Sequence, residues 1–246
     1  MEGSTLARVP AKPAFSTTSF TVTSSPPTTV YVKNTWTEQS DITDGDGDLE
    51  AAGTQTATFG TNAFGDLATA IANLDTTQPV TLIVNAGTYG DLDLSGLTNN
   101  VTVKIVEDQA AGSASTTIGE LTGSNNVTLE LGNIDGTHTT ATSLTVASGN
   151  FEGVISGDGG LVKTGTGTLT LGGANSYAGT TTIAAGRLSA TNSGALGTSS
   201  VALDGGILRT NVSLTNDISL DDVTTSFSNT IEVDGNYHIL SGKISG

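Results

Sequence analysis

The sequence has no cysteine, and it has only 8 lysine and arginine residues against 24 aspartates and glutamates in 246 residues. The missing cysteines exclude a disulfide framework and a thiolate metal site. The net charge of −16 disfavours nucleic acid and anionic membranes as partners, because their phosphates would repel the protein. No apolar run approaches the length of a transmembrane helix, so we expect no membrane insertion of this segment.

Aromatic residues are also scarce, at 4% of the chain, so a core must be built mainly from Val, Leu, Ile and Ala. Glycine, by contrast, supplies 32 of the 246 residues. That share is nearly double the roughly 7% that is usual. Together with many Thr, Ser and Asn residues, this composition favours short strands joined by turns, and the expected fold class is all-β.

The composition changes after the first thirty residues. Residues 1–29 are rich in Ser, Thr and Pro and are expected to form a flexible tail or linker. Residues 30–246 are expected to form a single domain. We expect a cap region at 30–79, first coils at 80–149, and a repeat followed by the start of a second copy at 150–246.

One helix is expected, in the cap region. Apolar residues at Phe64, Leu67 and Ile71 lie on one side of a helix that would run from Asn62 to Leu74, with Asn62 as its N-cap. Such a helix is well placed to cover the first coil of a solenoid.

Strands are expected through the rest of the domain, because apolar residues alternate with Thr or charged residues, as in half-buried strands. The predicted strands are Val30–Val32, Val80–Val84, Val101–Val106, Asn126–Leu131, Ser143–Val146, Gly167–Leu171, Thr181–Ile183, Val201–Leu203, Ile218–Leu220 and Thr230–Val233.

Two internal repeats indicate a solenoid. NNVTV begins at Asn99 and NNVTL at Asn125, 26 residues later, so their Asn side chains could stack as a ladder. GVISG begins at Gly153 and GKISG at Gly242, 89 residues later. Asn-Gly hairpin signals are missing between the strands, which favours coils of parallel strands over a meander. Glycine would then supply the positive φ that sharp corners need.

The segment from Gly157 to Leu188 resembles the passenger-associated transport repeat of bacterial autotransporters and large surface adhesins. The pattern of that repeat is G-x-G-x-L-x-K-x-G-x-G-T-L-x-L-x-G-x-N-x-Y-x-G-x-T-x-I-x-x-G-x-L. Its fixed positions are matched by Gly157, Gly159, Leu161, Lys163, Gly165, Gly167, Thr168, Leu169, Leu171, Gly173, Asn175, Tyr177, Gly179, Thr181, Ile183, Gly186 and Leu188. The resemblance implies a right-handed parallel β-helix, here with a short N-terminal capping helix, outside a Gram-negative-type cell.

The front half is similar to the first segment of pectate-lyase-like β-helices, in which a capping helix and a strand precede the residues A-G-T-Y. This similarity supports the fold and implies no activity, because the same segment occurs in enzymes and in inert stalks. Nothing in the chain resembles the membrane barrel in which autotransporters end. We therefore expect a fragment of a longer protein or another secretion route, and any outer-membrane anchor would lie in other regions.

These features predict a non-enzymatic, extracellular segment of a bacterial surface adhesin, a stalk or passenger that acts by rigid extension and by surface contact or self-association. Expected partners are glycans or proteins of a cell surface or matrix, and further copies of the chain, end to end or side by side. The alternative is a polysaccharide lyase or hydrolase, or a glycan-binding β-helix without turnover. No catalytic residue and no cofactor-binding residue is assigned.

A candidate metal site lies in an acidic loop, where Asp44, Asp46 and Asp48 alternate with glycines and Glu50 follows. Alternate carboxylates in a flexible loop can bind Ca²⁺. An EF-hand loop would place Gly where Leu49 lies and Glu where Gln55 lies, so the pattern departs from that motif twice. A solvated acidic loop is the favoured interpretation, and Ca²⁺ is the alternative.

Two further pairs of acidic residues are candidates for catalysis. Asp91 and Asp93 would share one face of a strand, as paired carboxylates of a glycan hydrolase would, yet no matching set from other coils is evident. Asp221 and Asp222 are adjacent and would point to opposite faces. Solvated turn acids are the favoured interpretation for both pairs.

Basic residues and histidines receive no catalytic role. Arg187 and Arg209 could act as a lyase base, but no acid cluster for Ca²⁺ is identifiable beside either. His138 and His238 have no partner spacing typical of a triad.

Threonine rows and two fixed residues of the repeat are interpreted as structural. Residues 166–170 and 180–182 carry T-x-T patterns, which ordinary strand propensity explains better than ice binding. Lys163 is expected to lay its stem over a coil, and Tyr177 to pack at a corner with its hydroxyl in water.

Titration calorimetry tests the acidic loop. If Asp44, Asp46, Asp48 and Glu50 are a solvated loop, millimolar Ca²⁺ should give no binding heat and no rise in Tm. Binding heat that Asp46→Asn abolishes would instead establish a calcium site.

Overall fold

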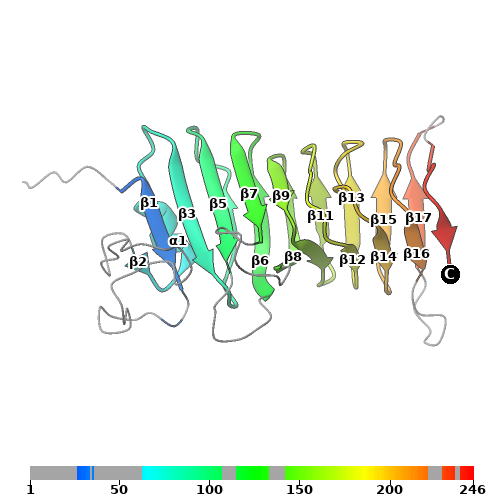
Figure 1. Ribbon diagram of the computed structural model, residues 1–246, viewed down its shortest axis with the longest axis horizontal. Coiled ribbons are helices and arrows are strands. Elements are labelled where there is room, and N and C mark those ends of the chain that lie inside the picture. Colours follow the sequence, from blue (N-terminus) through cyan, green and yellow to red (C-terminus); the bar gives the residue numbers. More distant parts are fainter. Residues whose placement is uncertain are drawn as a thin grey trace, which may run out of the picture.

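The structure, a computed structural model, describes residues 27–33, 35, 63–106, 115–132, 142–220, 229–235 and 239–246. Its strands stack along one long axis and progress from the N-terminal to the C-terminal end, in chain order on each side except that β2 precedes β1 (Figure 1). Every pairing between described strands is parallel. The fold is a parallel β-helix, which confirms the expected class.

One side of the coil is a sheet of six strands. In spatial order they are β2 (Ala63–Phe64), β1 (Thr29–Val32), β3 (Val80–Asn85), β5 (Val101–Val106), β7 (Val127–Leu131) and β9 (Val154–Gly157). The first described strand along the chain, β1, therefore lies second in the stack, between β2 and β3. Val101 pairs with Val127, which confirms the 26-residue repeat.

The other two sides belong to a twelve-stranded sheet that divides at β8 (Ser143–Phe151), whose first half pairs with β10 and whose second half pairs with β11. The first branch continues through β10 (Gly160–Lys163), β12 (Thr181–Ile183), β14 (Val201–Leu203), β16 (Ile218–Leu220) and β18 (Ile244–Ser245). The second branch contains β4 (Leu92–Leu94), β6 (Ser115–Gly123), β11 (Thr168–Leu171), β13 (Arg187–Ala190), β15 (Ile207–Thr210) and β17 (Thr230–Val233). The long strand β6 pairs with β8 over both halves and so takes part in both branches.

The core consists of straight rows of aliphatic side chains, because strand alternation turns every second residue inward and the parallel register stacks these residues. One row, in which every residue is fully buried, consists of Val30, Leu82, Val103, Leu129 and Ile155. A second contains Leu169, Leu188 and Leu208. Burying each such side chain contributes about 1.5–3 kcal/mol.

The helix is shorter than expected. Helix α1 spans Leu67–Ala72, and its N-cap is Asp66, whose Oδ1 accepts a hydrogen bond of 2.8 Å from the Thr69 amide. The predicted start at Asn62 is wrong, because Ala63–Phe64 pairs with β1 as a strand. The helix contacts β1, β2 and β4 at the N-terminal end, and its residues Leu67 and Ala70 are buried in the core (Figure 1).

All ten predicted strands exist, and five have the predicted bounds. The described strands that were not predicted are β2, β4, β6, β9, β10, β13, β15 and β18. The two G-x-I-S-G segments lie on different sides of the coil, since Ile155 belongs to β9 of the six-stranded sheet and Ile244 to β18 of the first branch.

Asparagine side chains link successive coils, although not by the amide-to-amide stacking expected. Asn99 Nδ2 donates to the carbonyl oxygens of Asp75 and Gln78, and Asn126 donates to those of Leu97 and Asn99. Each amide therefore satisfies backbone groups of the preceding coil, where a turn leaves them without a strand partner.

Asn175 bridges three coils. Its Oδ1 accepts a hydrogen bond of 2.8 Å from the Ile155 amide, and its Nδ2 donates to the Ala195 carbonyl oxygen at 2.6 Å. The side chain is 7% exposed. The Asn175 side chain takes the place of strand pairing at a buried corner. It therefore joins the preceding coil, through Ile155, to the following coil, through Ala195.

Replacing this bridge should weaken the whole stack. Asn175→Ala leaves the Ile155 amide and the Ala195 carbonyl without these partners, so we expect a loss of about 2–4 kcal/mol in the free energy of unfolding. Urea denaturation measures it. The control is Asn150→Ala, at an exposed position, which should change stability by less than about 0.5 kcal/mol. Equal effects of both substitutions would contradict the assigned role.

Candidate functional site

An acidic groove of about 330 Å³ lies on the outer side of the second branch. Its carboxylates come from three successive coils. Asp93 lies in β4 and Asp91 directly before it, Glu120 lies in β6, and Glu152 directly follows β8. From the sequence, Asp91 and Asp93 have no matching set of carboxylates in other coils. The structure corrects this, because the pairing of β4 with β6 and of β6 with β8 brings Glu120 and Glu152 alongside.

Asp93 is held by hydroxyl and amide donors. Its Oδ1 accepts hydrogen bonds from the Ser95 hydroxyl at 2.6 Å, the Thr122 hydroxyl at 2.7 Å and the Ser95 amide at 3.0 Å. These bonds, that from the Ser95 hydroxyl foremost, hold the pKa of Asp93 below its usual value. The carboxylate therefore stays ionised and links β4 to β6.

Asp91 is tied to the next coil in the same way. Its Oδ1 accepts a hydrogen bond of 2.8 Å from the Glu120 amide. The neighbouring residue is Gly119, where an added Cβ would lie 2.4 Å from the same oxygen. The close approach of this carboxylate to the backbone therefore requires glycine there.

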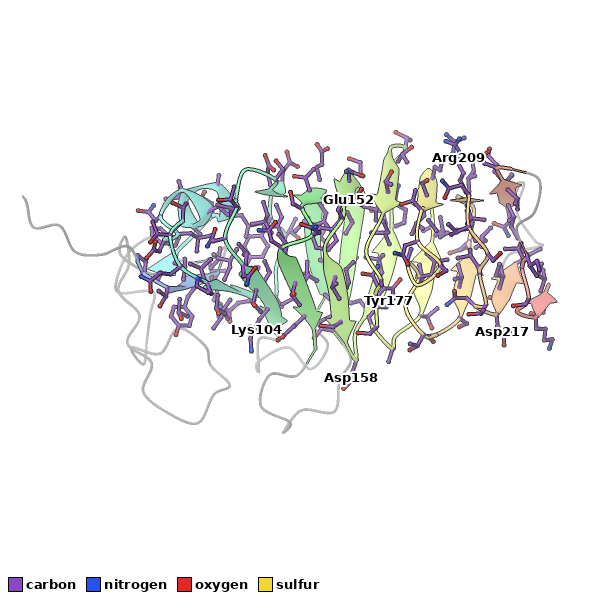
Figure 2. All side chains as sticks on the ribbon, turned by 90° about the horizontal axis from the view of Figure 1, so that it is seen from above. Lys104, Glu152, Asp158, Tyr177, Arg209 and Asp217 are labelled. Atoms are coloured by element: carbon purple, nitrogen blue, oxygen red, sulfur yellow. The ribbon has the colours of Figure 1, made fainter. Side chains whose placement is uncertain are left out.

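Farther along this side of the coil, two arginines form ion pairs. Arg187 contacts Glu232 at 3.2 Å, and Arg209 contacts Asp234 at 2.5 Å. Glu152 and Arg209 lie on the same side of the stack in Figure 2. Since both guanidinium groups are occupied by carboxylates of later coils, we assign neither to catalysis.

The groove does not form a metal centre. Among the residues that the structure describes, no three His, Asp or Glu side chains are placed to hold one ion. The loop with Asp44, Asp46, Asp48 and Glu50 lies outside the described residues, so Ca²⁺ binding there stays a prediction. Asp221, Asp222, His138 and His238 also lie outside the described residues, so the interpretations given to them from the sequence stay predictions.

Lys163 occupies an inward position, contrary to the expectation that it lies over the coil surface. It is stacked between Val146 and Ile183 and is fully buried. Its Nζ donates to the carbonyl oxygens of Thr164, Gly165 and Ala185, the last two at 3.1 Å. Burial lowers the pKa of this ammonium group.

The corner around Lys163 depends on Gly186, which has φ of 64°. A Cβ there would lie 2.5 Å from the carbonyl oxygens of Gly165 and Gly167. The expected use of glycine at corners is thus confirmed at this position.

Tyr177 also differs from its expectation. It is fully buried, and its hydroxyl lies 2.7 Å from the Thr181 hydroxyl oxygen instead of in water. Burial raises the pKa of Tyr177. Lys163, Asn175 and Tyr177, all fixed positions of the repeat, therefore organise the interior of the coil.

The threonine patterns lie on different sides of the coil. Thr168 and Thr170 belong to β11 of the second branch, whereas Thr182 belongs to β12 of the first. They do not combine into one flat threonine array.

Two comparisons with known proteins bear on the repeat and on the wider chain. Residues 161–190 match the passenger-associated-transport-repeat family, which confirms the repeat predicted from the sequence. The chain is also similar to the adhesin BmaC autotransporter of Brucella suis biovar 1 (strain 1330), with 40% identity over 129 residues. The aligned region is 51% of this chain and 4% of that relative, so the chain spans only a small part of the curated protein that it matches.

No solved structure matches the chain. The similarity to the first segment of pectate-lyase-like β-helices therefore stays a prediction. No described helix combines the length and the apolar character that crossing a membrane requires.

The hydrogen bonds of Asp93 make stability depend on pH. Because its folded-state pKa lies below the unfolded value of about 3.9, its contribution is complete above that value and is lost as pH falls through the folded pKa. At pH 7, Asp93→Asn should lose no more than about 1 kcal/mol, since the group is exposed to screening solvent.

Thermal unfolding across the acid range checks this, with Asp158→Asn as a control that removes the same charge. The difference in Tm between Asp93→Asn and Asp158→Asn should shrink below about pH 4. A difference that persists unchanged in acid would contradict the assignment.

Proposed function

We propose that the chain is a non-enzymatic segment of an extracellular bacterial surface adhesin, which holds a contact surface away from the cell on a rigid stem. One observation carries the proposal: two parallel sheets, one of six strands that ends at β9 and one of twelve strands that reaches β18, follow one long axis (Figure 1) in a chain that contains a passenger-type repeat. The name of the similar Brucella protein, an adhesin autotransporter, supports the location at the cell surface.

Rigidity follows from links between different coils. Besides the backbone ladder, these are the Asn175 bridge, the Lys163 contact to the Ala185 carbonyl oxygen, and ion pairs such as Lys104 with Glu130 at 3.3 Å. An exposed pair contributes at most about 1 kcal/mol, so the backbone ladder and the core supply most of the stiffness. Each added coil lengthens the stem by about 4.8 Å.

The chemistry of the groove supports a role without turnover. A glycosidase needs one carboxyl group that stays protonated, with a raised pKa, to donate to the leaving group. Asp93 has the opposite property, and three hydrogen bonds already engage one of its oxygens. Asp91 is likewise engaged with the backbone of the next coil.

The groove does favour one alternative, a polysaccharide-active or glycan-binding surface, because hydroxyls and carboxylates of Ser95, Thr122 and Glu152 line a hollow of about 330 Å³. Sugar hydroxyls can form hydrogen bonds with such groups.

Two measurements on the full chain test the proposal. Beads coated with the chain should adhere to cell or matrix surfaces under flow, and adhesion should persist in the Glu152→Gln variant. Incubation with neutral and acidic polysaccharides should release no product. Product release that Glu152→Gln abolishes would contradict the proposal in favour of the enzyme, and absence of adhesion to every surface would contradict the contact role.

A further inference from the structure

Lys163 places a charged group in the core without a charged partner. Its side chain is fully buried, and the inward positions before and after it in the stack are held by Val146 and Ile183. None of the ion pairs between described residues includes it. Burial lowers the pKa of its ammonium group, and no carboxylate offsets this shift. The charge is therefore held by hydrogen bonds to uncharged groups.

The acceptors of these hydrogen bonds belong to two corners on successive coils. One corner follows β10 and supplies the carbonyl oxygens of Thr164 and Gly165, and the other follows β12 and supplies that of Ala185. The amides of Ala184 and Ala185 donate to the Lys163 carbonyl oxygen at 2.9 and 3.3 Å. The backbone thus holds one corner against the other, so the positions of the three carbonyl oxygens do not depend on the lysine side chain alone.

The number of these oxygens matches the chemistry of a primary ammonium group, which has three N–H donors and no acceptor. Nζ of Lys163 lies 3.1 Å from the carbonyl oxygens of Gly165 and Ala185, and it also donates to that of Thr164. Among the backbone amides that the structure describes, none donates to these three oxygens. They form an acceptor set that the lysine fills.

Gly186 sets the size of the space around the ammonium group. An added Cβ at this position would lie 2.9 Å from Nζ of Lys163 and 2.5 Å from the Gly165 carbonyl oxygen. The backbone therefore closes against the ammonium group on this side. Carbonyl oxygens that converge in this way replace the water molecules that a cation gives up on burial.

We propose that this corner is a binding site for a primary ammonium group, built from backbone carbonyls, and that Lys163 supplies the ligand from within the chain. A buried charge is costly unless hydrogen bonds compensate it, and carbonyl oxygens without a donor are costly as well. The tethered ammonium group removes both costs at once. The coil therefore closes without a dissolved cation. This inference does not depend on the proposed role as an adhesin.

Chemical rescue tests the site. Lys163→Ala deletes the outer part of the side chain, which free n-propylammonium reproduces. We expect this ion to bind the variant saturably and, at ten times its Kd, to raise the folding equilibrium constant about tenfold. 1-Propanol has a similar size and no charge, so it should have little effect. Urea denaturation at constant ionic strength measures both.

Ile183→Ala is the matched control. Ile183 follows Lys163 in the same inward row and is also fully buried, so its truncation opens an apolar cavity in that row. n-Propylammonium should not stabilise this variant. The unmodified chain, in which Lys163 fills the site, should not respond either.

Nitrogen-15 NMR of the unmodified chain gives a measurement that needs no variant. The Nζ signal of Lys163 at pH 7 should be that of a protonated amine whose hydrogens exchange slowly with water, because three acceptors hold them. The exposed Lys243 should exchange rapidly and serves as the internal reference.

A neutral amine at Lys163 at pH 7 would overturn the inference. So would an absence of rescue, including a Lys163→Ala chain that stays unfolded in saturating n-propylammonium. Equal stabilisation by 1-propanol, or equal stabilisation of Ile183→Ala, would show that filling a cavity suffices and would also overturn it. None of these outcomes bears on adhesion or on the absence of turnover, so the proposed function could stand while this inference fails.

Discussion

Stacking in register is the constraint on which the structure depends: each inward side chain must lie on the inward side chain of the coil before it. The row of Leu169, Leu188 and Leu208 shows the pattern. Because side chains alternate along a strand, a slip of one residue would turn every aliphatic residue of that coil outward. Sheet order, coil length and the shape of the outer faces all follow from this requirement.

Corners are where the constraint is hardest to meet, since the ladder is interrupted there and buried backbone groups need other partners. Asn175 and Lys163 supply them from side chains, and Gly186 lets the backbone turn beneath. These residues are fixed positions of the passenger-type repeat. The repeat pattern therefore reports how the coil closes and carries no information on what the surface binds.

Much of the architecture could be predicted from local patterns, whereas long-range contacts could not. Alternation identified strands such as Val101–Val106, and the repeated NNVT segments gave the 26-residue step from β5 to β7. The start of α1 was misplaced because pairing of Ala63–Phe64 with β1 overrides helical periodicity. The burial of Lys163 was missed because a charged residue at an inward position contradicts the usual preference, which only its carbonyl partners offset.

The acidic groove escaped prediction for a related reason. Glu120 and Glu152 join Asp91 and Asp93 only through the pairings of β4, β6 and β8. Leu92 pairs with Leu121, 29 residues later, so the 26-residue offset of the NNVT segments does not give this register. The outer faces of the stack thus differ in charge although one interior pattern underlies them. A stem with a uniform core can in this way carry separate surfaces for different contacts.

The central claim is that the coils succeed each other along one axis, and distances between spin labels test it most directly. With one label at Thr117→Cys and the second moved to Thr182→Cys, Ala202→Cys or Ser219→Cys, the backbone separations should be about 14, 19 and 24 Å, one strand spacing more at each step. Separations that fail to increase in this order, as in a sandwich that folds back on itself, would contradict the account.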